Sequence, residues 1–501
     1  MFKRLLFSLL ALSAMTAWAD VPFRNHRYDG FKVIDTDSTQ IVFIGNSITN
    51  MHEWWEAFAD HRVINRGVSG ALSQETLANL ESILAGRPAK AFLMIGTNDL
   101  ATSGCNTAAH VATNVRHILK RFRSESPRTE LFVQSILPSR LRNLSLQRQT
   151  NDSLRKICGE MDVTYVDLWD KLADVAQSGN NTHTLDGLHL TASGYAIWCR
   201  TIAPLVGLNT VYSDATTDKT GSLGGSYGMR TSYFAALPVH EGDVLIIGDE
   251  MVHGGEWHEL LHCPRVKNRG NGWGLNGGEI AVVAKELPLI LGNCSKTGYP
   301  EQIFFYNGAW EVSNTATAIA DIMVAYRANV TTTRTLAPTT TIRLLPVIPG
   351  VASAEILSRT VTFNDSLRAY AAATEGVEFV DCYDLFYPGG TVDKRYFQGR
   401  YVNGPGYAKL SQVIAPYIEG ATATTDSAAN AALARFNART TLASTDNTVI
   451  KTSATSPSSG WTLSHSNTPG LFIVSSGNVQ FNQTQSGQGF ASTTGVLKKH
   501  L

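Results

Sequence analysis

The sequence lacks an excess of charge of either sign, since 42 Lys and Arg residues face 42 Asp and Glu residues. Balanced charge provides no general attraction to nucleic acid or to an anionic membrane surface, so we predict neither as a partner. After the first twenty residues the chain also lacks an apolar run long enough to cross a bilayer, so we predict no membrane span. The 501 residues, 43% hydrophobic and 17% charged, are enough for two or three globular domains.

Cysteine is scarce, with six residues in the whole chain. Their spacing matches none of the usual zinc or iron–sulfur patterns, which excludes a cysteine-based metal site. Each half of the chain holds three, and no regular framework suggests a particular pairing, so we predict no specific disulfide. The cysteines are Cys105, Cys158, Cys199, Cys263, Cys294 and Cys382.

The first nineteen residues have the three parts of an export signal. Lys3 and Arg4 give a basic start, "LLFSLLALSAM" gives a short apolar core, and Ala17-Trp18-Ala19 fits a cleavage site with small residues. We therefore predict a signal peptide over 1–19 and a secreted or periplasmic protein. A buried first helix is the alternative.

The chain contains a long internal repeat, in which the same blocks recur about 200 residues apart. Each copy alternates apolar strands with helical stretches, a pattern typical of a parallel sheet covered by helices on both faces. The paired blocks are "IVFIGNSITN" (41–50) with "VLIIGDEMVH" (244–253), "NRG" (65–67) with "NRG" (268–270), "NDSLR" (151–155) with "NDSLR" (364–368), and "DGLHLTASGY" (186–195) with "QGRYVNGPGY" (398–407).

These repeats divide the chain into segments. We predict a first domain over 20–207, a Gly/Ser/Thr-rich linker over 208–229 and a second domain over 230–420. The remaining residues, 421–501, are rich in Ser, Thr and Asn, and include the apolar islands "GWTLSH" and "GLFIVSS". This segment is either a small β module or a poorly ordered tail.

Five polar or glycine residues of the first copy are expected at the carboxyl edge of its sheet, where ligands bind in open α/β folds. Ser47 follows a strand and a Gly turn, and a serine nucleophile needs a base and an orienting group. His189 is the candidate base and Asp186 the candidate orienting carboxylate. The backbone N–H groups of Ser47 and Gly70 and the Asn98 amide are the candidate oxyanion donors.

Each of these residues has a structural alternative when taken alone. Asn98 could form a turn, Asp186 could cap a helix, and His189 could be an ordinary core residue. The whole set, in this order and at strand ends, favours the catalytic interpretation.

The blocks "GNSIT", "NRGVSG", "GTND" and "DGLHL" resemble those of the SGNH (GDSL-type) hydrolase superfamily. Residues 28 to 205 resemble its platelet-activating-factor acetylhydrolase branch and bacterial carbohydrate and sialate O-acetylesterases. The resemblance implies a three-layer α/β/α, flavodoxin-like fold, no cofactor, and ester hydrolysis through an acyl-serine. It also implies a Ser47–His189–Asp186 triad with an oxyanion hole from Ser47, Gly70 and Asn98. Asn46 stands where these proteins usually have Asp.

The second copy keeps the pattern of the fold and loses these groups. Ser47 is replaced by Glu250, and Gly70 aligns with Trp273, between Gly272 and Gly274. Gln398 and Tyr401 replace the Asp and His. We therefore predict a degenerate, catalytically silent second domain.

A second motif in this copy, His258-Glu259-Leu260-Leu261-His262, has the H-E-x-x-H form of a zinc site. The repeat aligns it with the ordinary helical stretch "WEAFA", and no third ligand follows at the usual spacing, so we predict a plain helix and no metal.

The predicted function is that of a secreted serine esterase that removes short acyl groups, above all acetyl, from a carbohydrate such as O-acetylated sialic acid. A phospholipid or another small ester is the alternative substrate. A carbohydrate-binding or surface-interaction protein is the alternative from another class.

Overall fold

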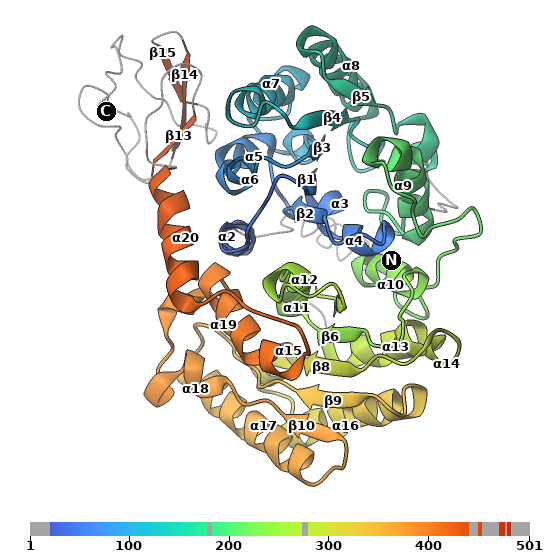
Figure 1. Cartoon of the computed structure of the whole chain (residues 1–501), viewed down its shortest axis with the longest axis vertical. Helices are drawn as coiled ribbons and strands as arrows, with labels where there is room; N and C mark the ends of the chain where they lie inside the picture. The colour runs from blue at the N-terminus through green and yellow to red at the C-terminus, as the bar shows by residue number, and fades with distance from the viewer. Residues whose placement is uncertain are drawn as a thin grey trace, which may run out of the picture.

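The computed structural model describes residues 21–177, 183–272 and 279–439, and the strand segments 449–452, 470–475 and 478–481. The predicted signal peptide lies outside the described residues. Two parallel sheets, each flanked by helices, make up most of the molecule, and the short helices α4 and α12 lie between them (Figure 1). Both sheets have five strands, so the repeat seen in the sequence is also a repeat of the fold.

The first sheet has the strand order β2-β1-β3-β4-β5, and all neighbouring strands are parallel. Its strands are β1 (Ile41–Gly45), β2 (Val63–Gly67), β3 (Lys90–Met94), β4 (Glu130–Gln134) and β5 (Thr164–Val166). The helices around it are α3 (Ser47–Asn50), α4 (Trp54–Ala57), α5 (Ser73–Ala78), α6 (Glu81–Gly86), α7 (Ala108–Glu125), α8 (Leu144–Met161) and α9 (Ala192–Val206), with the 3-10 turns η1 (Asp99–Ala101) and η2 (Asp170–Ala176).

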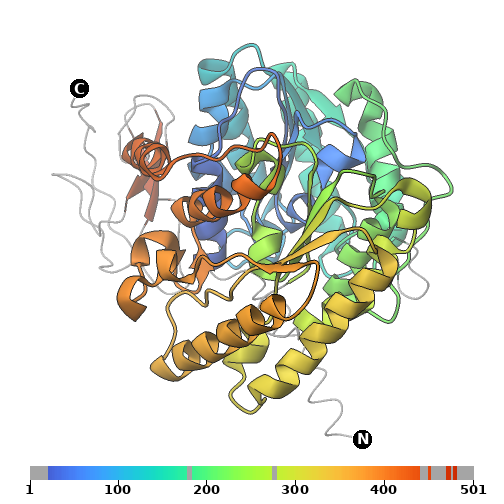
Figure 2. The same cartoon turned by 60° about the horizontal axis from the view of Figure 1, so that its bottom comes forward.

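The second sheet repeats this order as β7-β6-β8-β9-β10, again with parallel neighbours. Its long helices α16 and α17 run side by side on the side away from the first domain (Figure 2). The strands are β6 (Val244–Gly248), β7 (Val266–Gly270), β8 (Gln302–Tyr306), β9 (Thr341–Leu344) and β10 (Val377–Phe379). The helices are α11 (Glu250–Gly254), α12 (Trp257–Leu260), α13 (Glu279–Leu291), α14 (Cys294–Thr297), α15 (Ala309–Ser313), α16 (Ile319–Leu336), α17 (Ala354–Ala372), α18 (Tyr383–Phe386) and α19 (Gly404–Ile414).

The corner after the first strand is built in the same way in both domains. β1 and β6 are buried along their whole length, which explains their uninterrupted apolar sequence. Each ends in a glycine, and a Cβ on Gly45 or Gly248 would overlap the carbonyl oxygen of the neighbouring strand, on Met94 or Tyr306. The glycine of each corner is therefore required for the strand to turn into the helix.

Four of the buried ion pairs that join the two domains form two symmetric sets. Arg66 makes two hydrogen bonds, of 2.8 and 2.7 Å, to Glu259. The equivalent Arg269 makes two, of 2.6 and 2.7 Å, to Glu56. The second set joins Arg27 to Glu256 and Arg230 to Glu53, and these four residues are likewise equivalent in the two copies. The interface is thus that of a two-fold symmetric pair formed within one chain.

The helix that precedes each sheet contacts the last helix of the other domain. α2 (Val21–Lys32), which leads into the first sheet, packs on α19 of the second domain. α10 (Gly225–Ala236), which leads into the second sheet, packs on α9 of the first domain as well as on α13 of its own. The two copies therefore exchange contacts through their leading helices. α10 also begins inside the segment that we predicted as linker.

The C-terminal part contains more regular structure than its composition suggests. α20 (Asp426–Arg439) packs on α19, and three strands form an antiparallel sheet in the order β13-β14-β15. These strands are β13 (Val449–Thr452), β14 (Gly470–Ser475) and β15 (Asn478–Phe481). The island "GLFIVSS" overlaps β14, whereas "GWTLSH" lies outside the described residues.

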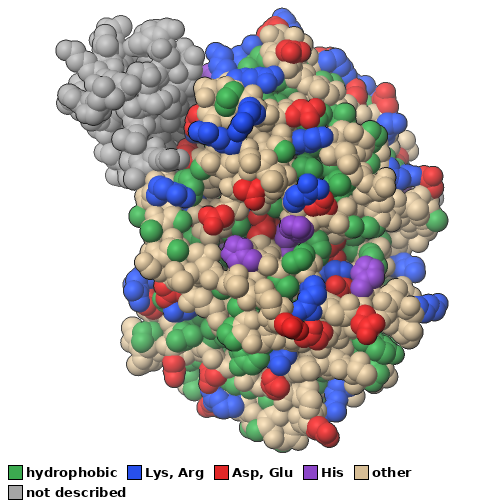
Figure 3. All heavy atoms as spheres, viewed as in Figure 1, with side chains coloured by type: hydrophobic (Ala, Val, Ile, Leu, Met, Phe, Trp, Pro, Cys, Tyr) green, Lys and Arg blue, Asp and Glu red, His purple; other side chains and the backbone are tan. Residues whose placement is uncertain are grey.

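The six cysteines are all buried, and none forms a disulfide. Within the described residues, no helix combines the length and the apolar character that a membrane span requires. Lys and Arg are interspersed with Asp and Glu on the face shown in Figure 3, in keeping with the zero net charge.

Candidate active site

Ser47 is the first residue of α3, directly after the strand β1. The side chain of Asn46 caps this helix by accepting a hydrogen bond of 3.0 Å from the N–H of Ile48, so an amide does here what Asp249 does in the second copy. The serine is 5% exposed, and the N–H groups at the start of the helix lie beside its hydroxyl.

His189 and Asp186 meet Ser47 although they lie far away in the sequence. The Nε2 atom of His189 is 2.8 Å from the Oγ atom of Ser47, and its Nδ1 atom is 2.7 Å from Oδ2 of Asp186. The other carboxylate oxygen, Oδ1, accepts hydrogen bonds from the backbone N–H groups of His189 and Leu188, at 2.9 and 2.8 Å. Three of the candidate site residues thus form one chain of hydrogen bonds.

The charge on Asp186 determines which nitrogen of His189 carries the proton. Burial alone would raise the pKa of this carboxyl, but the charge of His189 and the hydrogen bonds from His189 and Leu188 outweigh burial and lower the pKa to about 2. Asp186 is therefore ionised near neutral pH, and its Oδ2 atom accepts a hydrogen bond from the Nδ1–H group of His189. This leaves Nε2 as an acceptor for the Ser47 hydroxyl.

Gly70 and Asn98, the two remaining candidate residues, lie close together, since the Asn98 side chain contacts the residue that follows Gly70. Gly70 has a φ of +77°, a left-handed conformation that favours glycine. The Asn98 amide donates one hydrogen bond, of 3.1 Å, to the carbonyl of Ala71, which keeps its second N–H for another acceptor. The neighbouring Asp99 accepts hydrogen bonds from Ser73 on α5, and burial raises its pKa to about 7.

The hydroxyl, the base, the carboxylate and nearby amide donors are the groups that acyl transfer through a serine requires. Residues 43–197 also match the model of the GDSL-like lipase/acylhydrolase family. The first domain is therefore similar to this family over most of its length. The match and the site together indicate a serine ester hydrolase, and we call this domain the GDSL-like domain from here on.

Three solved structures similar to the chain each cover between 34% and 40% of its length. One is a Streptococcus pneumonia protein provisionally described as a platelet activating factor, with 26% identity, a TM-score of 0.35, and coverage of 40% of this chain and 99% of that one. A GDSL-like lipase from Bacteroides thetaiotaomicron has 22% identity, a TM-score of 0.29, and coverage of 34% and 88%. An acetylxylan esterase from Geobacillus stearothermophilus has 16% identity, a TM-score of 0.30, and coverage of 35% of this chain and 96% of that one. A search of curated proteins found no match.

The equivalent corner of the second domain has different chemistry. Glu250 takes the place of Ser47 and forms an ion pair with Arg400, 3.1 Å away. Tyr401, which aligns with His189, accepts a hydrogen bond from the same arginine. Gly272 lies at the end of β7, but Trp273 and Gly274 are outside the described residues. This corner provides a carboxylate and a guanidinium where the GDSL-like domain has a hydroxyl and an imidazole.

The H-E-x-x-H residues lie at the domain interface. Glu259 is the partner of Arg66, so its carboxylate already neutralises a buried guanidinium. The His258 ring stacks on Trp55 of the GDSL-like domain, with ring centroids 5.0 Å apart. The preceding residue, Trp54, is buried in the core of the GDSL-like domain and stacks on Phe43. Among the described residues, no group of three or more His, Cys, Asp or Glu side chains is arranged to hold a metal ion.

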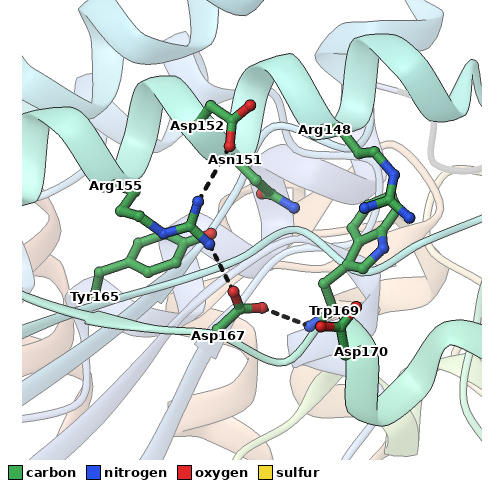
Figure 4. Close-up of a pocket in the computed structure, with 8 residues that line it drawn as sticks. All are labelled: Arg148, Asn151, Asp152, Arg155, Tyr165, Asp167, Trp169 and Asp170. Carbon is green, nitrogen blue, oxygen red and sulfur yellow. Dashed lines mark hydrogen bonds and ion pairs between the residues drawn. The ribbon is translucent and has the colours of Figure 1, made fainter.

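A shallow cavity of about 180 Å³ opens beside α8 and the end of β5, and none of the triad residues lines it (Figure 4). Arg155 bridges Asp152 and Asp167 there and covers the Tyr165 ring. The second domain repeats this arrangement around Arg368, with Asp365, Asp381 and Phe379, so most of the wall belongs to the scaffold. Arg148, which covers Trp169, aligns with Val361, so this part is specific to the first copy.

Sequence reasoning missed the residues that hold the α3 corner in place. The Tyr195 hydroxyl donates a hydrogen bond of 2.7 Å to the carbonyl of Ile48, and Tyr407 does the same for Met251. The tyrosine recurs at the end of both "DGLHLTASGY" and "QGRYVNGPGY". That repetition in an otherwise divergent block is the signal that identifies it as a structural residue.

Proposed function

We propose that the GDSL-like domain hydrolyses short acyl esters, with Ser47 as nucleophile, His189 as general base and Asp186 as its orienting carboxylate. The observation that carries the proposal is the continuous contact from the Ser47 hydroxyl through the imidazole to the carboxylate, at 2.8 and 2.7 Å. These distances lie within the range in which a proton is transferred.

The first half of the reaction forms an acyl-enzyme. Nε2 of His189 takes the hydroxyl proton as Oγ of Ser47 attacks the ester carbonyl, and the carbonyl oxygen becomes an oxyanion. The N–H groups of Ser47 and Gly70 and the second N–H of Asn98 stabilise this charge. The tetrahedral intermediate then collapses, the imidazolium returns the proton to the leaving alcohol, and an acyl-serine is left.

The second half repeats these steps with water. His189 removes a proton from the water molecule, the resulting tetrahedral intermediate expels Ser47, and the proton returns to Oγ. The products are a carboxylic acid and an alcohol, and the enzyme returns to its starting state.

The proposal also names the acyl group, acetyl, and the kind of alcohol, a carbohydrate. These two assignments rest on the resemblance of the motif blocks to those of carbohydrate and sialate O-acetylesterases. We propose an O-acetylated sugar as substrate. Phospholipid and other small esters are the alternatives that the substrate series below distinguishes.

The test compares the wild-type protein with Ser47→Ala on 4-nitrophenyl acetate, butyrate and octanoate, and then on O-acetylated sugars including sialic acid. We expect the wild type to prefer acetate and the variant to lose at least about 10³-fold in kcat, since the nucleophile is gone. Equal turnover by both proteins would refute the serine mechanism. Turnover of octanoate or phospholipid in preference to acetate would refute the acetyl assignment.

We also propose that the second domain is catalytically silent, because Glu250 stands in place of the serine and is held by Arg400, and Tyr401 aligns with His189. Glu250→Ala should then leave esterase activity unchanged.

The export signal is part of the proposal as well. In a bacterial host that secretes the protein, the mature chain should begin at Asp20, and N-terminal mass spectrometry of the exported fraction would show this.

A further inference from the structure

We infer that the second copy completes the catalytic corner of the first: Arg230, Tyr233, Ser232 and Asp218, which lead into the second domain, are positioning residues for Ser47 and His189. This inference rests on the proposed ester hydrolysis. It assigns a role to residues of the predicted linker (Asp218) and of the start of the predicted second domain (Arg230, Ser232 and Tyr233).

The first half of the argument concerns α3, the short helix that begins at Ser47. A helix of this length leaves its last carbonyl groups without partners inside the helix, so other groups must hold them. Side chains of the GDSL-like domain hold the first three, and residues of α10 hold the fourth. The donors are Tyr195 to Ile48 (2.7 Å), Trp54 to Thr49 (2.8 Å), Asn65 to Asn50 (3.0 Å), and Arg230 and Tyr233 together to Met51.

Arg230 also connects this carbonyl to the domain interface. Its side chain is fully buried, forms the ion pair with Glu53 at 2.7 Å, and donates a hydrogen bond to the carbonyl of Gly270 on β7. The N–H of Met51 in turn donates to the carbonyl of Ser47, at 2.9 Å. A single guanidinium therefore links the second sheet to the turn of helix that bears the nucleophile.

The second half concerns the loop that bears His189, which runs directly into α9. The first N–H groups of α9 need acceptors, and the segment before the second domain provides them. Ser232 accepts a hydrogen bond of 2.9 Å from the N–H of Ala192. Asp218 accepts one of 2.8 Å from the N–H of Ser193, and another of 2.8 Å from the hydroxyl of Thr191. The same segment thus contacts both the helix that begins at Ser47 and the start of the helix that follows His189.

The second domain contains the equivalent set of contacts, made by Arg27, around a corner that has Glu250 in place of the serine. Arg27 of α2 donates a hydrogen bond of 2.7 Å to the carbonyl of Gly254, pairs with Glu256, and donates to the carbonyl of Gly67. Every one of these contacts is the counterpart of an Arg230 contact. Arg27 is therefore the matched comparison: its helix-end contact, to Gly254, lies at the corner of the second domain, whereas its contact to Gly67 lies on β2 of the GDSL-like domain.

The experiment measures kcat and KM for 4-nitrophenyl acetate in full-length Arg230→Met and Arg27→Met, beside the wild type and Ser47→Ala, well below the melting temperatures of all four. We expect similar melting temperatures for the two arginine variants. We expect Arg230→Met to lose at least about tenfold in kcat with little change in KM, because small displacements of a reacting group are costly. Arg27→Met should lose clearly less kcat than Arg230→Met, because it leaves the Met51 carbonyl held.

Three variants that remove fewer interactions can test the inference if Arg230→Met does not fold. Arg230→Lys retains the charge and one donor and should recover part of the lost kcat, whereas Tyr233→Phe and Asp218→Asn each remove a single interaction and should lower kcat several-fold. Equal kcat losses in the Arg27 and Arg230 variants, or wild-type kcat in Tyr233→Phe and Asp218→Asn, would overturn the inference. Inactivity of the wild type on every ester would instead refute the proposed hydrolysis.

Discussion

The two domains share strand order, register and corner construction, but they differ in the few side chains on which chemistry depends. The pairing of β1 with β2, from Ile41 with Val63 to Gly45 with Gly67, recurs in β6 and β7 at every equivalent position. The contacts that hold the corner recur as well. What changes is the residue presented by the corner, Ser47 in one copy and Glu250 in the other. The frame of this corner is therefore kept in both copies by structural contacts that do not depend on the residue it presents.

The largest effect should come from Asp186, whose counterpart is Gln398. Asp186→Asn removes the charge that keeps the proton on Nδ1 of His189, so we expect kcat to fall by about 10³- to 10⁴-fold. Gln398→Ala is the control in the second domain and should not change activity, because we propose that this domain is inactive. Steady-state kinetics on 4-nitrophenyl acetate would show the difference. Activity of Asp186→Asn within tenfold of wild type would contradict the assigned role.

The next effect concerns the symmetric ion pairs at the interface. Arg66→Met leaves Glu259 buried without a partner, which should reduce the free energy of unfolding by about 3–5 kcal/mol. Arg269→Met should cost less, because Glu56 also faces Lys267, whose Nζ atom lies 3.9 Å from its carboxylate. Urea denaturation of both variants measures this.

The combined variant Arg66→Met/Glu259→Leu is the control, since it removes both charges and should recover much of the loss. A single substitution that costs less than about 1 kcal/mol would mean that the charge is solvated, contrary to its burial.

A smaller catalytic effect is expected at Asn98. Asn98→Ala removes one donor from the developing oxyanion and should cost about 3 kcal/mol of transition-state stabilisation, seen as a loss of about 10²-fold in kcat. A higher KM with an unchanged kcat would indicate a role in substrate binding instead. Asn79→Ala, which removes another Asn of the same domain, is the control and should leave kcat unchanged.

The smallest expected effect concerns pH and a buried carboxyl of the second domain. Glu286 on α13 accepts hydrogen bonds from Thr231 and Asn271, and burial raises its pKa from the ordinary 4.5 to about 7. The folded state therefore keeps this proton while the unfolded chain releases it, so stability falls as pH rises from 4.5 to 7. Glu286→Gln should raise the unfolding free energy at pH 8 by about 2–3 kcal/mol, and by little at pH 4.5.

Urea titrations of the wild type and Glu286→Gln at both pH values test this, with the exposed Glu375→Gln as control. Parallel pH profiles for the wild type and Glu286→Gln would contradict the raised pKa.

Much of the fold and the site follows from the sequence, because both depend on local patterns. The apolar runs and Gly corners predict the parallel strands, and the motif blocks identify the residues that the structure brings together around Ser47. The partners of the two "NRG" blocks could not be predicted. Arg66 contacts Glu259 across 193 positions, and a repeat shows which residues are equivalent but not which of them touch.

The leading helices escaped prediction for a related reason. A helix is recognised by an apolar face, but the buried faces of α2 and α10 present polar side chains to the other copy. His26, Arg27, Arg230, Thr231 and Ser232 are all fully buried. Because their hydrogen-bond partners come from distant segments, the sequence around them resembles a surface loop, and α10 lies partly within a stretch that composition assigns to a linker.

The exchange of leading helices also sets the order in which the protein can be completed during synthesis. The nucleophile's corner lacks the guanidinium that holds the Met51 carbonyl until translation has passed residue 233, after the entire first sheet has been made. α2 must wait much longer, since α19 ends at Ile414. The first helix of the described chain is therefore among the last to find its final neighbour, and neither half can reach its mature form alone on the ribosome.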